Sequence, residues 1–163
     1  MLVRYGLLAF LNKDAIKRVA HFPPMIGAER AAFWIYQIST IAVFITLLFL
    51  RIQIYQSLLS YISLAVYVIG LLLLILSIIS FAAPAKNGIN QNGLYRLSRN
   101  PIYVAYFIYF IGCAMLTRSL IIFGLVLIFQ VSAHWIILSE ERWCTEQFGT
   151  EYLQYMKKVR RYI

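Results

Sequence analysis

The chain is built from four long apolar stretches separated by shorter polar segments. The stretches cover residues 31–50, 58–81, 102–116 and 120–138, and none of them contains Asp, Glu, Lys or Arg. A helix needs about 20 apolar residues to cross a hydrocarbon core about 30 Å thick, and lipid-exposed backbone is confined to helices and closed barrels. The third stretch approaches this length only if it runs over residues 101–117. The pattern predicts an all-α integral membrane protein with four transmembrane helices.

The segments that connect and precede these stretches refine the prediction. Only Thr117, Arg118 and Ser119 separate the third stretch from the fourth, which predicts an antiparallel helical hairpin. The segment Leu2–Ala20 combines Leu and Phe residues with scattered charges, and we expect it to form an interfacial helix that ends near Pro23. A partial or re-entrant span is the alternative for this segment.

The C-terminal tail has the pattern of an amphipathic helix. Phe148, Tyr152 and Tyr155 recur at helical spacing, opposite a face rich in Glu, Gln and Lys. We expect Gly149 and Thr150 to divide the tail, because Gly favours helix ends and Thr favours helix starts. The apolar stripe lies either on lipid or over the polar loop between the second and third stretches, where it would close a pocket.

Composition agrees with a membrane setting. Hydrophobic residues make up 62% of the 163 residues and charged residues 13%, whereas globular proteins contain about 25% charged residues. These values exclude a soluble domain, an intrinsically disordered chain and a disulfide-stabilised secreted scaffold. Cys113, Cys144, His21 and His134 show no metal-ligand spacing, so no metal site is predicted.

The basic residues are divided unevenly by this topology. The formal net charge is +9, yet the chain lacks the lysine-rich run or basic helix that is typical of nucleic-acid binding. Thirteen of the fifteen Lys and Arg residues fall on one side of a four-span bundle, and Arg51 and Arg118 fall on the other. Because cytoplasmic loops carry the excess of Lys and Arg, both termini and the central loop are predicted to be cytoplasmic.

The central loop, residues 84–101, is rich in Asn and Gly. A connection between helices needs about 2–8 residues, so a longer loop beside the bilayer indicates a function. Asn100 and Pro101 are favoured at a helix start, and Arg99 stands just before it. The helix N-terminus and Arg99 together suit a carboxylate or phosphate. The alternative is a capped helix whose arginine contacts a lipid phosphate.

Two acidic residues follow the fourth stretch. Glu140 and Glu141 lie where a helix dipole does not stabilise them, so a cationic partner would explain them. His134 precedes Glu141 by seven residues and projects from the same helical face; it is either functional or a hydrogen-bonded structural histidine. A ligand with both charges would suit this end of the bundle. S-Adenosylmethionine is one such ligand, although charge pairing alone does not select it.

Three spaced motifs lie in this part of the chain. They are Gly93-Leu94-Tyr95-x-x-x-Arg99-Asn100-Pro101-x-Tyr103, then Glu140-Glu141, then Phe148-Gly149-x-Glu151-Tyr152-x-x-Tyr155-x-x-x-Val159. In this order, around a helical hairpin, they resemble the isoprenylcysteine carboxyl methyltransferase family. More broadly they are similar to the membrane methyltransferases that include phospholipid N-methyltransferases. The similarity covers about residues 87–161.

The resemblance implies an integral membrane enzyme that binds S-adenosylmethionine between the central loop and the C-terminal region. It implies that Glu140 and Glu141 face the amino-acid part of the cofactor and that Tyr152 and Tyr155 form a lid. The remaining cofactor-binding residues that it implies are Asn87, Gly93, Leu94, Tyr95, Arg99, Asn100, Pro101 and Tyr103.

The chain departs from the family pattern Arg-His-Pro-x-Tyr-x-Gly at two positions. Asn100 replaces the His and Ala105 replaces the Gly, while Asn87 stands where many members have a cofactor-contacting His. Asn100 can still donate a hydrogen bond and begin a helix, but a role that needs an ionisable imidazole there is lost.

The predicted function is methyl transfer to a lipophilic acceptor, a membrane lipid or a lipidated molecule. The leading expectation is isoprenylcysteine-type carboxyl methylation or methylation of a lipid-like analogue, in which Arg99 would orient the carboxylate. The first alternative is methylation of a phospholipid amine, for which Glu141 or His134 would accept a proton. The alternatives are an NADPH-dependent sterol-reductase-like enzyme and a four-span transporter. We expect a single membrane domain, with residues 1–30 as an interfacial segment, residues 31–81 as the first two spans and residues 82–163 as the methyltransferase-like region.

Overall fold

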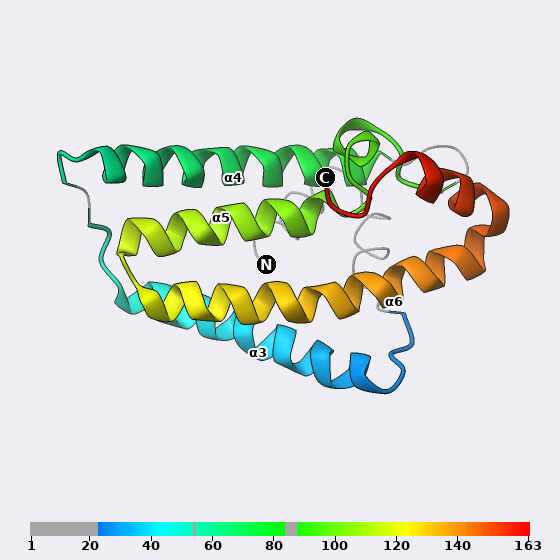
Figure 1. Ribbon diagram of the computed structural model, residues 1–163, viewed down its shortest axis with the longest axis horizontal. Coiled ribbons are helices and arrows are strands. Elements are labelled where there is room, and N and C mark those ends of the chain that lie inside the picture. The colour runs from blue at the N-terminus through cyan, green and yellow to red at the C-terminus, as the bar shows by residue number, and fades with distance from the viewer. Residues whose placement is uncertain (1–22, 54, 84–87) are drawn as a thin grey trace.

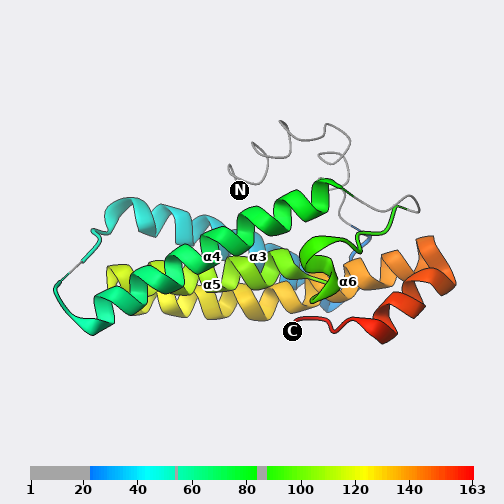
Figure 2. The same cartoon turned by 90° about the horizontal axis from the view of Figure 1, so that it is seen from above.

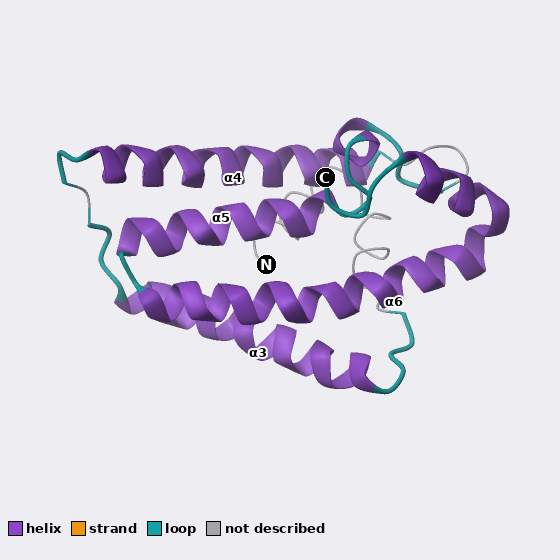
Figure 3. Ribbon diagram, viewed as in Figure 1, coloured by secondary structure: helices purple, strands orange, loops and turns teal. Residues whose placement is uncertain are grey.

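The computed structural model describes residues 23–53, 55–83 and 88–163. In these residues the chain forms helices and connecting loops without a strand (Figure 3). The elements are α3 (Ala28–Phe49), α4 (Leu58–Ala82), the short 3-10 helix η1 (Gly93–Arg96), α5 (Pro101–Thr117) and α6 (Leu120–Lys158). The all-α prediction is therefore confirmed for the described residues, whereas the predicted helix Leu2–Ala20 lies outside them.

The helices match the apolar stretches closely, with one exception. α3, α4 and α6 are each long and apolar enough to cross a membrane, and α5 is a shorter apolar helix of 17 residues. α6 runs past the apolar stretch to Lys158 with a kink at Gly149, so it includes both the apolar stretch and the predicted helical tail. Its polar C-terminal part therefore extends beyond the apolar bundle.

The four helices pack in the order α4, α5, α6 and α3 (Figure 1). Seen from above, α4 crosses α5 at an angle (Figure 2). The rings of Tyr36, Phe110 and Phe129 lie in the core, with centroids 5.0 Å apart for Tyr36 and Phe129 and 5.4 Å apart for Phe110 and Phe129. Many Ile and Leu side chains point outward and are exposed, which is the surface that a lipid environment requires.

The crossing of α4 and α5 depends on two glycines. A Cβ added to Gly70 would overlap the backbone nitrogen of Tyr109, and one added to Gly112 would lie 2.5 Å from the Cα atom of Tyr67. The two backbones are thus in direct contact, as in other membrane helix pairs with small residues at the interface. This close approach holds α5 against α4.

The connection between α5 and α6 is as short as predicted. Arg118 takes the left-handed conformation at the end of α5 (φ 50°), and the side chain of Ser119 accepts a hydrogen bond from the backbone N–H of Ile122 (3.3 Å). The two helices form the expected antiparallel hairpin. Consequently the start of α5 and the distal part of α6 lie at the same end of the bundle (Figure 1).

Candidate active site

Gly149 reverses the direction of the chain at the distal end of α6. Its backbone angles (φ 53°, ψ −127°) are not helical, and this conformation is readily available only to glycine. The final helical segment returns toward the start of α5 (Figure 1). The predicted break at Gly149 is confirmed.

The returning segment covers the central loop. Tyr152 and Tyr155 are buried and pack with Ile89 of the loop, and the hydroxyl of Tyr155 donates to the carbonyl oxygen of Tyr95 (2.7 Å). Of the two predicted positions for the apolar stripe, the structure therefore selects the one over the loop. Burial raises the pKa of both tyrosine hydroxyls, so they remain protonated donors.

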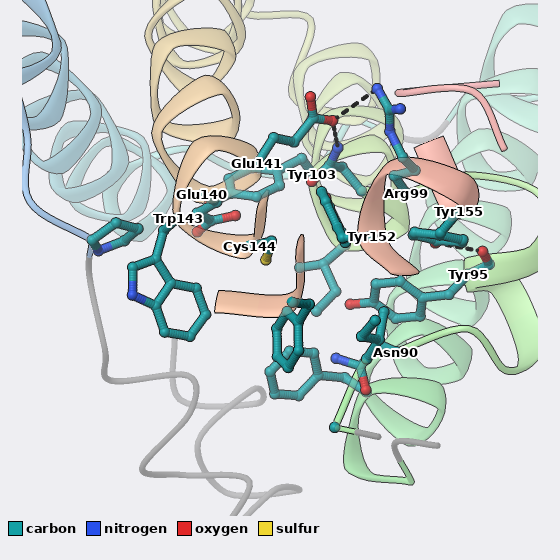
Figure 4. Close-up of a pocket in the computed structure, with 17 residues that line it drawn as sticks. Asn90, Tyr95, Arg99, Tyr103, Glu140, Glu141, Trp143, Cys144, Tyr152 and Tyr155 are labelled. Carbon is teal, nitrogen blue, oxygen red and sulfur yellow. Dashed lines mark hydrogen bonds and ion pairs between the residues drawn. The ribbon is translucent and has the colours of Figure 1, made fainter. Parts of the chain in front are cut away.

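A cavity of about 430 Å³ lies between the loop, the N-terminal end of α5, the distal part of α6 and the returning segment (Figure 4). Its size is within the range of small-molecule sites, about 300–1,000 Å³. It is lined by Pro23, Phe81, Gly88, Ile89, Asn90, Tyr95, Arg99, Asn100, Ile102, Tyr103, Glu140, Glu141, Trp143, Cys144, Phe148, Tyr152 and Tyr155.

Glu141 is the centre of a buried ion cluster on the wall of this cavity. Its Oε1 lies 3.1 Å from Nη2 of Arg99, and its Oε2 accepts from Nε (3.0 Å) and Nη2 (2.9 Å) of Arg161. The Glu141 and Arg99 side chains are only 5% and 8% exposed. The hydrogen bonds from Arg161 to Glu141 raise the pKa of that arginine further. Both oxygens of Glu141 are thus occupied by guanidinium groups.

The last residues of the chain complete this cluster. The backbone N–H of Arg99 donates to the carbonyl of Arg160 (2.9 Å), and the hydroxyl of Ser98 donates to the carbonyl of Arg161 (3.3 Å). Nη1 of Arg99 donates to the carbonyl of Met156 (3.2 Å). The tail therefore fixes the loop residue whose side chain lines the cavity.

Asn100 has a different role from the predicted helix cap. Pro101 does occupy the first turn of α5, as predicted, but the Asn100 side chain makes no capping hydrogen bond. Its Nδ2 donates instead to Oε1 of Glu141 and to the carbonyl of Arg161, both at 3.2 Å. A side-chain amide carries two donors, which suits this bridge between α6 and the tail.

Glu140 has a separate partner from Glu141. Its Oε1 accepts a hydrogen bond from the hydroxyl of Tyr103 (2.8 Å), and both residues line the cavity. Successive residues of a helix point in directions about 100° apart, so the two adjacent glutamates face different neighbours. Glu140 thus adds a carboxylate to the cavity wall apart from the arginine cluster.

Two buried polar atoms of cavity residues have no hydrogen-bond partner among the described residues. They are the Nε of Arg99 and the Oδ1 of Asn90. Buried polar groups are almost always hydrogen-bonded, so these two atoms are candidate contacts for a bound ligand.

The structure brings together eight of the predicted site residues: Tyr95, Arg99, Asn100, Tyr103, Glu140, Glu141, Tyr152 and Tyr155. Gly93, Leu94 and Pro101 do not line the cavity, and Asn87 lies outside the described residues. His134 does not line it either; its Nδ1 lies 2.6 Å from the hydroxyl of Tyr162. This contact agrees with the alternative of a hydrogen-bonded histidine.

Gly93 has a structural explanation. Its φ of 56° favours glycine, and an added Cβ would overlap the hydroxyl of Ser80. The Leu94 N–H donates to the hydroxyl of the same Ser80 (3.4 Å). Gly93 therefore holds η1 against α4, next to the cavity residue Tyr95.

Several cavity residues were not predicted from the sequence as cofactor contacts. Asn90 is one of several polar residues in the loop, and its spacing does not distinguish it from the others. Phe81 and Ile102 belong to predicted membrane spans, and Pro23 belongs to the predicted interfacial segment. Trp143, Cys144 and Phe148 belong to the apolar stripe of the tail. The apolar stripe of the tail could have indicated these three residues, because a stripe that packs over the loop must line any cavity between the tail and the loop.

The fold and this cavity define an apolar helical protein with a partly open cavity, lined by both aromatic and charged side chains, at one end of its bundle. The family model for phospholipid methyltransferase matches residues 37–151, well over half of the chain. The protein belongs to this family. Searches of curated proteins and of solved structures found no match.

Membership in the family establishes a membrane-bound methyltransferase that uses S-adenosylmethionine as methyl donor. The cavity fits this cofactor, which offers hydrogen-bond acceptors in its carboxylate and hydroxyl groups and donors in its amino groups. Arg99 Nε and Asn90 Oδ1 present the complementary unpaired atoms. The aromatic side chains of Tyr95, Phe148 and Tyr155 give the apolar surface that a nucleoside needs.

Proposed function

We propose that the protein methylates the headgroup amine of a membrane phospholipid. The observation that carries this proposal is the Glu140 carboxylate, which lines the cavity and is hydrogen-bonded by Tyr103. The family match supports a lipid acceptor. When bound, S-adenosylmethionine supplies a methyl group on a positively charged sulfur, and displacement of this methyl requires in-line alignment and desolvation of the nucleophile.

Glu140 is our candidate for proton acceptor. A headgroup ammonium must lose a proton before its nitrogen can act as a nucleophile, and a carboxylate can take this proton. Glu141 is less suited, because both of its oxygens bind guanidinium groups. His134 lies away from the cavity lining. The Tyr103 hydroxyl would keep the Glu140 carboxylate in one orientation.

We further propose that the loop and tail side of the cavity holds the cofactor. Asn90, Tyr95, Arg99 and Tyr155 line this side, and Trp143 lies across the cavity from Tyr95 and Tyr155 (Figure 4). The Glu141 cluster would then act by fixing Arg99 and Asn100 rather than by contacting the acceptor. Gly93, Leu94 and Pro101 would support this wall from behind.

A carboxylate acceptor of the isoprenylcysteine type is the second candidate. It is supported by the motif resemblance and by the Arg99 Nε, a buried donor without a partner among the described residues. A carboxylate needs no base, and a guanidinium N–H can orient it. In that case the charged group of the acceptor would approach Arg99 rather than Glu140.

The proposed topology has four spans, with α5 as a short third span. The cavity end of the bundle would face the cytoplasm, because it carries most of the Lys and Arg residues. The whole chain would form one membrane domain. The acceptor would reach the cavity from the adjoining leaflet.

One experiment separates the two acceptors. The purified protein in nanodiscs is supplied with methyl-labelled S-adenosylmethionine and either phosphatidylethanolamine or a farnesylated cysteine. An amine acceptor gives label that is stable in alkali and extracts with lipid, whereas a carboxyl acceptor gives an ester that releases labelled methanol in alkali. Alkali-stable label on the phospholipid, lost in Glu140→Gln, supports our proposal. Labelled methanol only, or no transfer to either acceptor, would refute it.

A further inference from the structure

Arg142 forms a two-pronged ion pair with Glu29 at the start of α3. Its Nη1 lies 2.6 Å from Oε1 of Glu29, and its Nη2 lies 2.7 Å from Oε2. The Glu29 side chain is only 11% exposed and that of Arg142 35%. Paired N–H···O bonds of this kind fix the relative orientation of the two groups as well as their distance.

The pair also holds the chain segment that precedes α3. Nη2 of Arg142 donates to the carbonyl of Pro24 (3.0 Å), and the backbone N–H of Ile26 donates to Oε2 of Glu29 (2.9 Å). Pro23, the neighbour of Pro24, lines the cavity. Arg142 of α6 therefore holds the segment that contributes Pro23 to the cavity wall.

Arg142 stands between cavity residues in the sequence. Glu140, Glu141 and Trp143 all line the cavity, whereas Arg142 does not. The three charged residues of this run bind three different parts of the molecule: Glu140 binds Tyr103 of α5, Glu141 binds the loop and tail arginines, and Arg142 binds the start of α3. Of these three contacts, the one between Arg142 and the start of α3 lies on the side of the cavity formed by Pro23 and Trp143.

This side of the cavity adjoins the start of α3. Trp143 lies across the cavity from Tyr95 and Tyr155 (Figure 4). α3 begins directly after the Pro23–Gly27 segment, and its side chains Trp34 and Ile38 are exposed. A lipid that lies along α3 would meet the cavity at Pro23 and Trp143.

We propose that Glu29 and Arg142 are positioning residues that hold the Pro23 wall against Trp143 and so set the geometry in which the lipid acceptor binds. This inference rests on the proposed lipid acceptor, but not on which atom of the lipid is methylated. The pair contacts neither the cofactor wall nor Glu140, so its loss should affect the acceptor selectively.

The test compares Glu29→Gln, Arg142→Gln and the charge exchange Glu29→Arg with Arg142→Glu in full-length protein. The two single variants should raise the acceptor KM by about tenfold, since small misplacements of a bound substrate can cost up to about 100-fold in rate. Their Kd for S-adenosylhomocysteine should stay at the wild-type value. The charge exchange should restore part of the acceptor KM, because it renews the ion pair but not the hydrogen bonds to Pro24 and Ile26. Arg30→Gln, which removes an exposed charge next to Glu29 in the sequence, is the matched control.

The outcomes separate this inference from the proposed function. If wild-type protein transfers methyl to neither lipid, the proposed function fails, whatever the variants do. If wild-type protein is active and the single variants keep the control KM, the positioning role is overturned. An equal loss of S-adenosylhomocysteine affinity in the single variants, without rescue by the charge exchange, would also overturn it, because the pair would then support the fold as a whole.

Discussion

The Glu141 carboxylate of α6 is held by residues from two other parts of the chain. Arg99 and Asn100 come from the loop, and Arg161 comes from the tail. Removing one partner of a buried ion pair leaves an uncompensated charge and commonly costs about 3–5 kcal/mol. The cluster therefore couples the stability of this end of the molecule to the shape of the cavity.

We predict that Glu141→Gln lowers the melting temperature and weakens S-adenosylhomocysteine binding, because Arg99 and Arg161 would lose their shared counter-ion. Tryptophan fluorescence during heating measures the first effect and calorimetric titration the second. Glu146→Gln, an exposed acid five residues later, serves as control. A Glu141→Gln variant that behaves like this control would show that the cluster does not support the cofactor wall.

Cys144 offers a chemical probe of the same wall. Burial, with a smaller contribution from the nearby Glu140, raises its pKa to about 12. The thiolate is the nucleophile, so alkylation by iodoacetamide at pH 8 should be very slow in the folded protein and fast after unfolding. Mass spectrometry of a Cys113→Ala variant measures this directly. Rapid alkylation of the folded protein would contradict the raised pKa of Cys144.

Some residues of the candidate site could be predicted from the sequence and others could not. Tyr95, Arg99, Tyr103 and Glu140 could be assigned to one site because the motifs that carry them are specific. The partners of Asn100 could not be predicted, because a helix start gives no information on a tail that returns 61 residues later. From the sequence, Arg161 contributes only to the predicted membrane topology, because nothing in the sequence shows that the tail returns to Glu141.

At the level of elements, the apolar stretches predicted the helices because membrane spans need long uncharged runs. The start of α5 at Pro101 and the tight hairpin before α6 were also predictable from local residues. The position of the tail could not be predicted, because the same amphipathic pattern fits a helix on a lipid surface and a helix that covers the loop. The buried contacts of Tyr152 and Tyr155 with Ile89 select the second.

The contact between α4 and α5 gives a prediction at this scale. Gly112→Leu should destabilise the protein, because the new side chain would meet the α4 backbone at Tyr67, and overpacking typically costs about 1–3 kcal/mol. Thermal melting in detergent checks this. Gly124→Leu is the control, since an added Cβ there meets nothing within 4 Å. Equal melting temperatures for the two variants would contradict the close crossing.

The molecule as a whole has one basic end, which also contains the cavity. We therefore predict that this end faces the cytoplasm. In a variant without Cys113 and Cys144, Gln53→Cys should react with a membrane-impermeant maleimide added outside intact cells, and Gln147→Cys should react only after the cells are opened. Both positions are exposed. Gln53 lies in the connection between α3 and α4, and Gln147 lies in the distal part of α6, at the other end of the bundle (Figure 1). The reverse labelling pattern would invert the topology.

The central claim is that the cavity between the loop, α6 and the returning tail is the cofactor site. Calorimetric titration of the purified protein with S-adenosylhomocysteine tests it most directly, with wild type compared with Asn90→Ala and Tyr155→Ala, which alter the wall without touching the Glu141 carboxylate. We expect saturable binding of one ligand per chain in the wild type and weaker binding in both variants. No binding at millimolar ligand, or wild-type affinity in both variants, would contradict the assignment.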